Sequence, residues 1–146
     1  MTALDPELAL DPAHWLTRLS PEEWVRAALN ELALAEKAYA RGDTRAGLAG
    51  AKRAAGMALN GALRVVPNDA WGRSYVDHVR GLGSDESAPE PVRAACRVLL
   101  ETPDIGPEKL VTLRTKSDGP PKAIEAAKDV MAHAYAIVMK KDVKDA

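Results

Sequence analysis

Hydrophobic residues recur along this chain at the three- and four-residue spacing of amphipathic helices, without the alternation that is typical of strands. Ser20, Pro21 and Glu23 form a capping-box pattern, which predicts the start of a long helix. The pattern predicts helices near residues 21–41, 44–66, 70–82, 90–101 and 122–140, and a short one near 107–114. The expected fold is therefore an all-α, antiparallel bundle of about five helices.

The two ends of the chain differ from its middle. Residues 1–19 carry two Asp-Pro steps, and each proline suits the first turn of a short helix. We expect a loose N-terminal arm with a short helix there. Residues 141–146 are expected to be a polar tail that does not pack, which leaves residues 20–140 as a single bundle domain.

The second predicted helix has two uncharged faces. One face is the expected core stripe, and the other carries Gly50, Ala54, Met57 and Gly61. A glycine inside a helix costs about 1 kcal/mol relative to alanine, so this face indicates that another backbone approaches closely. The approach is either a contact within the bundle or a contact between two copies. We expect a homodimer with these four residues in its interface.

Composition and charge narrow the function classes. The chain has 146 residues, which is about one domain, and no phenylalanine. Its 20 Lys and Arg residues nearly balance 21 Asp and Glu residues, so no overall field draws it to nucleic acid or to an anionic membrane. Cys96 alone excludes an internal disulfide framework. Since no secretory signal or spanning apolar run is present, we expect a cytoplasmic protein without membrane contact.

A resemblance to a known family rests on two segments. Residues 35–43 (AEKAYARGD) and 51–63 (AKRAAGMALNGAL) resemble the first helix pair of HEPN domains. Gly56 and Asn60 depart from the family, in which a glutamate and a lysine are frequent there. The resemblance implies dimerisation and a partner of the nucleotidyltransferase type, or another component of a stress, defence or toxin–antitoxin system. A tetratricopeptide-like interpretation of residues 42–67 is weaker because no second copy follows.

Some HEPN domains are metal-independent ribonucleases with an R-x(4–6)-H motif, and Arg73 and His78 match its spacing. In such a site the arginine holds the phosphate and the histidine moves a proton. On an ideal helix the two positions lie about 140° apart, however. We therefore expect Arg73 to be a solvated side chain and His78 to be a hydrogen-bonded core residue. A non-catalytic binding module is the main expectation, and the ribonuclease is the alternative.

Other candidate chemistry is sparse. The exposed cations that we expect as an RNA or nucleotide patch are Arg93, Arg97, Lys109 and Arg114. Cys96 lies on an apolar stripe, so an inert buried thiol is expected. The sequence has no phosphate-binding glycine loop and no dinucleotide fingerprint, and Asp129 with His133 makes at most a weak metal pair. We expect no metal and no cofactor.

Overall fold

The structure is a computed structural model that describes residues 18–72, 74–102 and 121–145. In chain order its elements are α3 (Pro21–Ala40), α4 (Thr44–Val65), the 3-10 turn η1 (Asp69–Trp71), α5 (Tyr75–Gly83), α6 (Glu90–Glu101) and α8 (Lys122–Asp145). These described segments contain no strand, so the expected all-α bundle is confirmed. The short helix expected near 107–114 lies outside the described residues, as does nearly all of the N-terminal arm.

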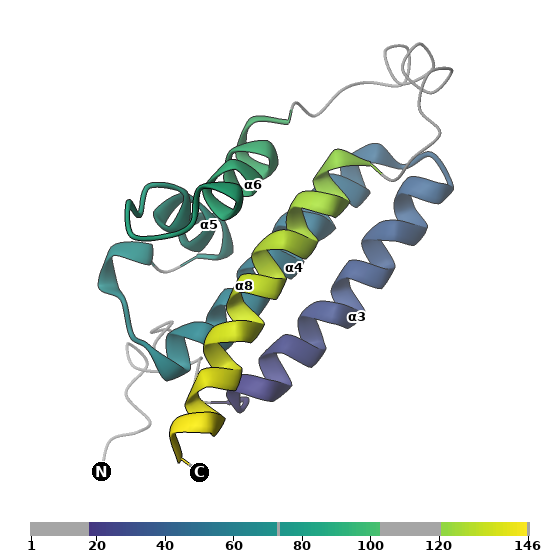
Figure 1. Ribbon diagram of the computed structural model, residues 1–146. Coiled ribbons are helices and arrows are strands. Elements are labelled where there is room, and N and C mark those ends of the chain that lie inside the picture. The colour runs from purple at the N-terminus through teal and green to yellow at the C-terminus, as the bar shows by residue number, and fades with distance from the viewer. Residues whose placement is uncertain (1–17, 73, 103–120, 146) are drawn as a thin grey trace, which may run out of the picture.

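Helix α4 is the central element of the bundle. It packs against α3, α8 and α5, and more lightly against α6. Figure 1 shows α3, α4 and α8 lying side by side, while α5 and α6 form a pair on the other flank of α8. The start of α3 lies beside the second half of α8 because the two helices run in opposite directions (Figure 1). None of the described helices combines the length and apolar character that crossing a lipid bilayer requires.

Local capping explains where α3 and α4 begin. The Ser20 hydroxyl accepts a hydrogen bond from the Glu23 amide at 3.1 Å, and the Glu23 carboxylate accepts one from the Ser20 amide at 2.8 Å. The expected capping box is thereby confirmed. Gly42 ends α3 with a φ of +86°, a conformation that favours glycine, and Asp43 then caps α4. This tight turn makes α3 and α4 antiparallel neighbours.

The glycines on the second face of α4 make contacts inside the chain. A Cβ atom on Gly50 would lie 2.9 Å from the Cβ of Ala35, and one on Gly61 would lie 2.7 Å from a backbone carbonyl at the start of α3. Ala54 is fully buried, and the half-buried Met57 packs against the core. Close approach within the bundle is therefore confirmed. Gly50, Ala54 and Gly61 are therefore buried inside the chain and do not form a surface for a second copy, while the homodimer itself stays a prediction.

The third predicted helix is two elements. Trp71 ends η1, Gly72 has a φ of +69°, and α5 begins only at Tyr75. The Ser74 hydroxyl caps α5 by accepting the Asp77 amide at 3.0 Å. A single helix over residues 70–82 was the wrong prediction, because the glycine conformation and the serine cap interrupt it.

The last helix is longer than predicted. Helix α8 continues to Asp145, whereas the pattern predicted an end near residue 140 followed by a tail. Lysine is a good helix former, and the helix therefore continues where the apolar stripe ends.

A candidate binding groove

A groove of about 520 Å³ lies where α8 passes the end of α4 and the loop between α5 and α6. It is lined by Val65, Val66, Asn68, Trp71, Leu82, Asp85, Ser87, Ala88, His133, Ile137 and Lys140. We call this set of residues the groove. A second hollow of about 580 Å³ lies on the other side of Trp71, between η1, α5 and the start of the loop that follows α5.

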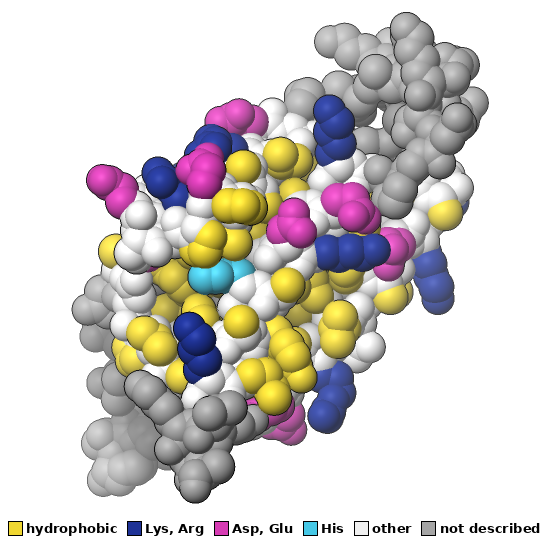
Figure 2. All heavy atoms as spheres, in the orientation of Figure 1, with side chains coloured by type: hydrophobic (Ala, Val, Ile, Leu, Met, Phe, Trp, Pro, Cys, Tyr) yellow, Lys and Arg dark blue, Asp and Glu magenta, His cyan; other side chains and the backbone are white. Residues whose placement is uncertain are grey.

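Apolar side chains make up much of the groove. Leu82 is buried, Ile137 and Ala88 are half-buried, and Val66 is 56% exposed. Figure 2 shows hydrophobic side chains on the face on which α8 lies, with charged side chains between and around them. An exposed valine beside other apolar atoms is a surface that gains free energy when another apolar group covers it.

Three ionisable side chains border the groove. Burial lowers the pKa of the half-buried His133, Lys140 lowers it further, and Asp85 partly offsets this effect. Asp85 accepts hydrogen bonds from the Ser87 hydroxyl at 2.6 Å and the Ser87 amide at 2.9 Å, and these bonds lower the pKa of its carboxyl group. The lowered pKa values favour a neutral imidazole at His133 and a charged, hydrogen-bonded carboxylate at Asp85.

Trp71, which borders the groove, carries a buried donor without a partner. The side chain is 5% exposed, and its indole Nε1–H has no hydrogen-bond partner. A buried donor without a partner costs about 1–3 kcal/mol.

His78 lies beneath this region as a core residue. It is 3% exposed, and its Nδ1 lies 2.9 Å from the backbone carbonyl oxygen of Trp71, to which the neutral ring donates. Burial lowers its pKa, and the Trp71 carbonyl and Asp77 only partly offset this. The expectation of a hydrogen-bonded core histidine is confirmed. Arg73 lies outside the described residues, and because α5 begins at Tyr75, the helical angle assumed between the two positions does not apply.

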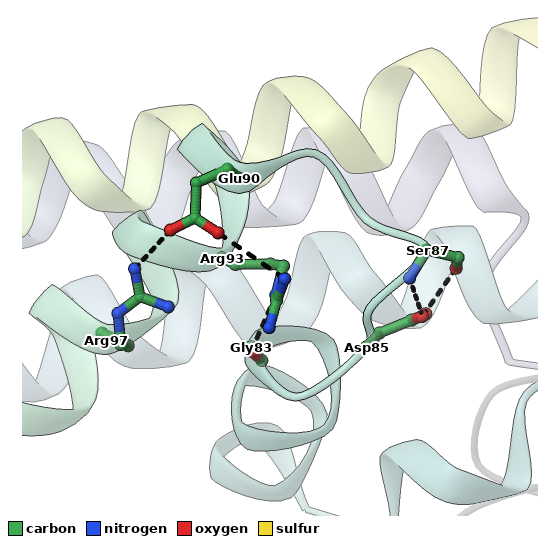
Figure 3. A network of polar contacts seen from close by, with 6 residues as sticks. All are labelled: Gly83, Asp85, Ser87, Glu90, Arg93 and Arg97. Atoms are coloured by element: carbon green, nitrogen blue, oxygen red, sulfur yellow. Dashed lines mark hydrogen bonds and ion pairs between the residues drawn. The ribbon is translucent and has the colours of Figure 1, made fainter.

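Two of the predicted RNA-binding cations are paired with one carboxylate. Figure 3 shows Arg93 and Arg97 both directed towards Glu90, with Arg97 at 2.6 Å and Arg93 at 3.6 Å. Arg93 also donates from Nε to the Gly83 carbonyl at 3.4 Å, which ties α6 to the end of α5. The other two members of the predicted patch, Lys109 and Arg114, lie outside the described residues. The RNA patch stays a prediction, and its described half is partly neutralised.

The remaining candidate groups are a thiol, a hydroxyl and possible metal ligands. Cys96 is fully buried, and burial raises the pKa of its thiol to about 11, so the expected inert thiol is confirmed. The Ser87 hydroxyl donates to the Asp85 carboxylate, whose lowered pKa makes it a weak base. Within residues 18–72, 74–102 and 121–145, no three His, Cys, Asp or Glu side chains are placed to hold a metal ion.

Sequence reasoning missed the groove as a site. Its polar members come from segments about fifty residues apart, and the sequence alone does not place Asp85 beside His133. One signal was present: Ile137 is an apolar residue next to the core stripe of α8, on the side that also carries His133 and Lys140.

The described segments form an all-α bundle with a groove beside α8. Comparison with family models found no match, and neither a curated protein nor a solved structure matches the chain significantly. The resemblance to HEPN domains therefore stays a prediction from residues 35–43 and 51–63.

Proposed function

We propose that the protein is a non-catalytic, HEPN-like helical module that binds an apolar segment of a polypeptide in the groove. The observation that carries this proposal is the composition of the groove, in which apolar walls are joined to a few polar groups. Binding sites are commonly built in this way, since apolar contacts supply affinity and a few polar groups fix orientation.

The dimensions of the groove suit a short peptide segment. His133 and Lys140 are seven residues apart on α8, which corresponds to about 10 Å along the helix. Two turns of a bound helix or a short extended segment match this length. Asn68 and Ser87 supply amide and hydroxyl groups at its border that suit a peptide backbone.

The position of His78 supports a binding role over the ribonuclease alternative. A general base must reach the proton that it removes, and a buried imidazole that already donates to a backbone carbonyl does not meet this requirement. The identity of the partner comes from the resemblance alone, which implies a nucleotidyltransferase-type protein and a homodimer. Light scattering of the purified chain tests the homodimer.

A peptide selection tests the groove. A phage-displayed library of random peptides is selected on the intact protein, and the recovered peptides are measured by fluorescence anisotropy. Val66→Asp places a charge in the groove at a residue that is 56% exposed, and Leu34→Asp is a matched control on α3 at 58% exposed. We expect apolar peptides whose binding is lost in Val66→Asp and kept in Leu34→Asp. Equal binding by both variants would refute the proposal.

A further inference from the structure

The side of α8 that faces away from the bundle is apolar. Residues 130–139 contain no aspartate, glutamate, lysine or arginine, and yet Ala132, Tyr135, Ala136 and Met139 are exposed. These four residues, which we call the outer face of α8, lie on one side of the helix because the last three follow Ala132 by three, four and seven residues. A helical segment that is uncharged on every side is typically covered on every side.

Leu29 of α3 extends the outer face. Glu36 of α3 and Lys128 of α8 form an ion pair at 3.8 Å. Leu29 lies seven residues, or about two turns, before Glu36, and Tyr135 lies seven residues after Lys128. Because α3 and α8 run in opposite directions, Leu29 and Tyr135 lie at the same level, and they are 55% and 48% exposed. Figure 1 shows α8 in front of α4, so Figure 2 looks onto this apolar surface.

One charged residue of each sign borders the uncharged stretch. Asp129 precedes it and Lys140 follows it, eleven residues later. Eleven residues are about 20° more than three full turns and about 16 Å along a helix, so the two residues lie on one line of α8. Both are exposed, and among the described residues neither forms an ion pair. The carboxylate on the other side of the groove, Asp85, is bonded to the Ser87 amide and hydroxyl.

This order of charges is complementary to itself. When a second α8 packs on the outer face in the opposite direction, a two-fold axis at the level between Ala134 and Tyr135 brings Asp129 of one copy opposite the partner's Lys140. The axis then lies at the middle of the uncharged stretch, and the symmetry forms the same pair twice. A parallel arrangement would instead place like charges together, which is unfavourable.

We propose that the outer face of α8, together with Leu29, is the surface on which two copies of the chain associate, with antiparallel α8 helices and Asp129 opposite the partner's Lys140. The two alanines of the outer face allow the helices to approach closely, and its tyrosine and methionine supply apolar area. The resemblance to HEPN domains implies a homodimer without locating its interface, and the charges on α8 assign one. This inference does not depend on the proposed function of the groove.

A charge exchange in the full chain tests the pairing. Sedimentation equilibrium at low ionic strength, where screening is weak, gives the dimer Kd of the wild type, of Asp129→Lys and of Lys140→Glu. Each variant alone places like charges opposite each other twice, and we expect its Kd to rise by about tenfold or more. In an equal mixture of the two variants opposite charges meet again, so we expect a heterodimer with a Kd close to that of the wild type.

A second pair of variants tests the apolar part of the surface. Ala136→Arg places a charged side chain in the middle of the outer face, and Ala49→Arg is the matched control at an exposed alanine of α4. We expect Ala136→Arg to be monomeric at concentrations at which Ala49→Arg and the wild type are dimeric. Both positions are exposed, and far-UV circular dichroism verifies that the helices of each variant are intact.

Three results would overturn the inference. A wild-type chain that is monomeric at high micromolar concentration would show that the copies do not associate. A mixture of Asp129→Lys and Lys140→Glu that associates no more tightly than either variant alone would show that these residues do not face each other. A dimer that persists in Ala136→Arg would place the contact on another side of the bundle.

Discussion

Gly56→Ala is the substitution that most directly tests the packing of α4 against α5. Gly56 is buried in the middle of α4. A Cβ atom built on Gly56 would lie 2.3 Å from the Cβ and 2.6 Å from the Cα of Tyr75, the first residue of α5. A side chain of any size at this position therefore requires the two helices to separate.

The expected cost follows from these distances. Carbon atoms in contact lie about 3.5–4.0 Å apart, so one of the helices has to move by about 1 Å. Overpacking of a core costs about 1–3 kcal/mol, and contact with backbone atoms places this case at the upper end. The higher helix propensity of alanine returns about 1 kcal/mol. We expect a net loss of about 2 kcal/mol, which lowers the Tm by roughly 6 °C in a chain of this size.

Urea unfolding followed by far-UV circular dichroism measures this loss as a shift of the midpoint. Ala49→Gly is the matched control, because Ala49 is an exposed residue of the same helix. This control isolates helix propensity, with an expected loss of about 1 kcal/mol. If Gly56→Ala instead stabilises the protein by the amount that propensity alone predicts, the close contact between α4 and Tyr75 is not present in solution.

Three further predictions concern the buried histidines, the core and the first helix cap. The folded-state pKa values of His78 and His133 are lowered, so the unfolded chain binds more protons near their ordinary value of 6.5. The contribution of these histidines to the free energy of unfolding is therefore complete above about pH 7.5 and decreases as the pH falls through 6.5. His78→Gln should make the free energy of unfolding, measured by urea titration, depend less steeply on pH. An unchanged pH dependence would contradict the burial of His78. Leu59→Ala removes a fully buried side chain and should cost about 2–5 kcal/mol, whereas a loss below about 1 kcal/mol would place Leu59 outside the core. Ser20→Ala removes the hydroxyl of the capping box and should cost about 1 kcal/mol by thermal melting, and no change would mean that the cap is not formed.

The helices could be predicted from the sequence where the signals are local. The capping box at Ser20 and the turn at Gly42 depend on neighbouring residues, and both were found in their predicted places. The two uncharged faces of α4 likewise predicted a helix covered on two sides. Local signals were weaker around Gly72. There a positive φ and the Ser74 cap divide the single helix that the hydrophobic pattern predicts over residues 70–82.

The groove could not be predicted because it depends on the packing of distant segments. Val66, Asp85 and His133 meet only after α8 packs onto α4 and α6. The sequence likewise does not identify what packs on the glycine face of α4, because a surface of small residues fits a neighbouring helix and a second copy equally well. Only the position of α3 shows that Gly50 and Gly61 are already covered.

The four glycines of α4 also govern how the protein unfolds. Each lowers the intrinsic tendency of the segment to be helical by about 1 kcal/mol relative to alanine, or about 4 kcal/mol in all. An isolated peptide of this sequence would therefore not remain helical, and the segment owes its order to the helices around it. The central element of the bundle has no stability of its own, and α4 should lose its backbone hydrogen bonds only when its neighbours detach. The slowest amide exchange should accordingly occur in α4, at the rate of global unfolding, despite its glycine content.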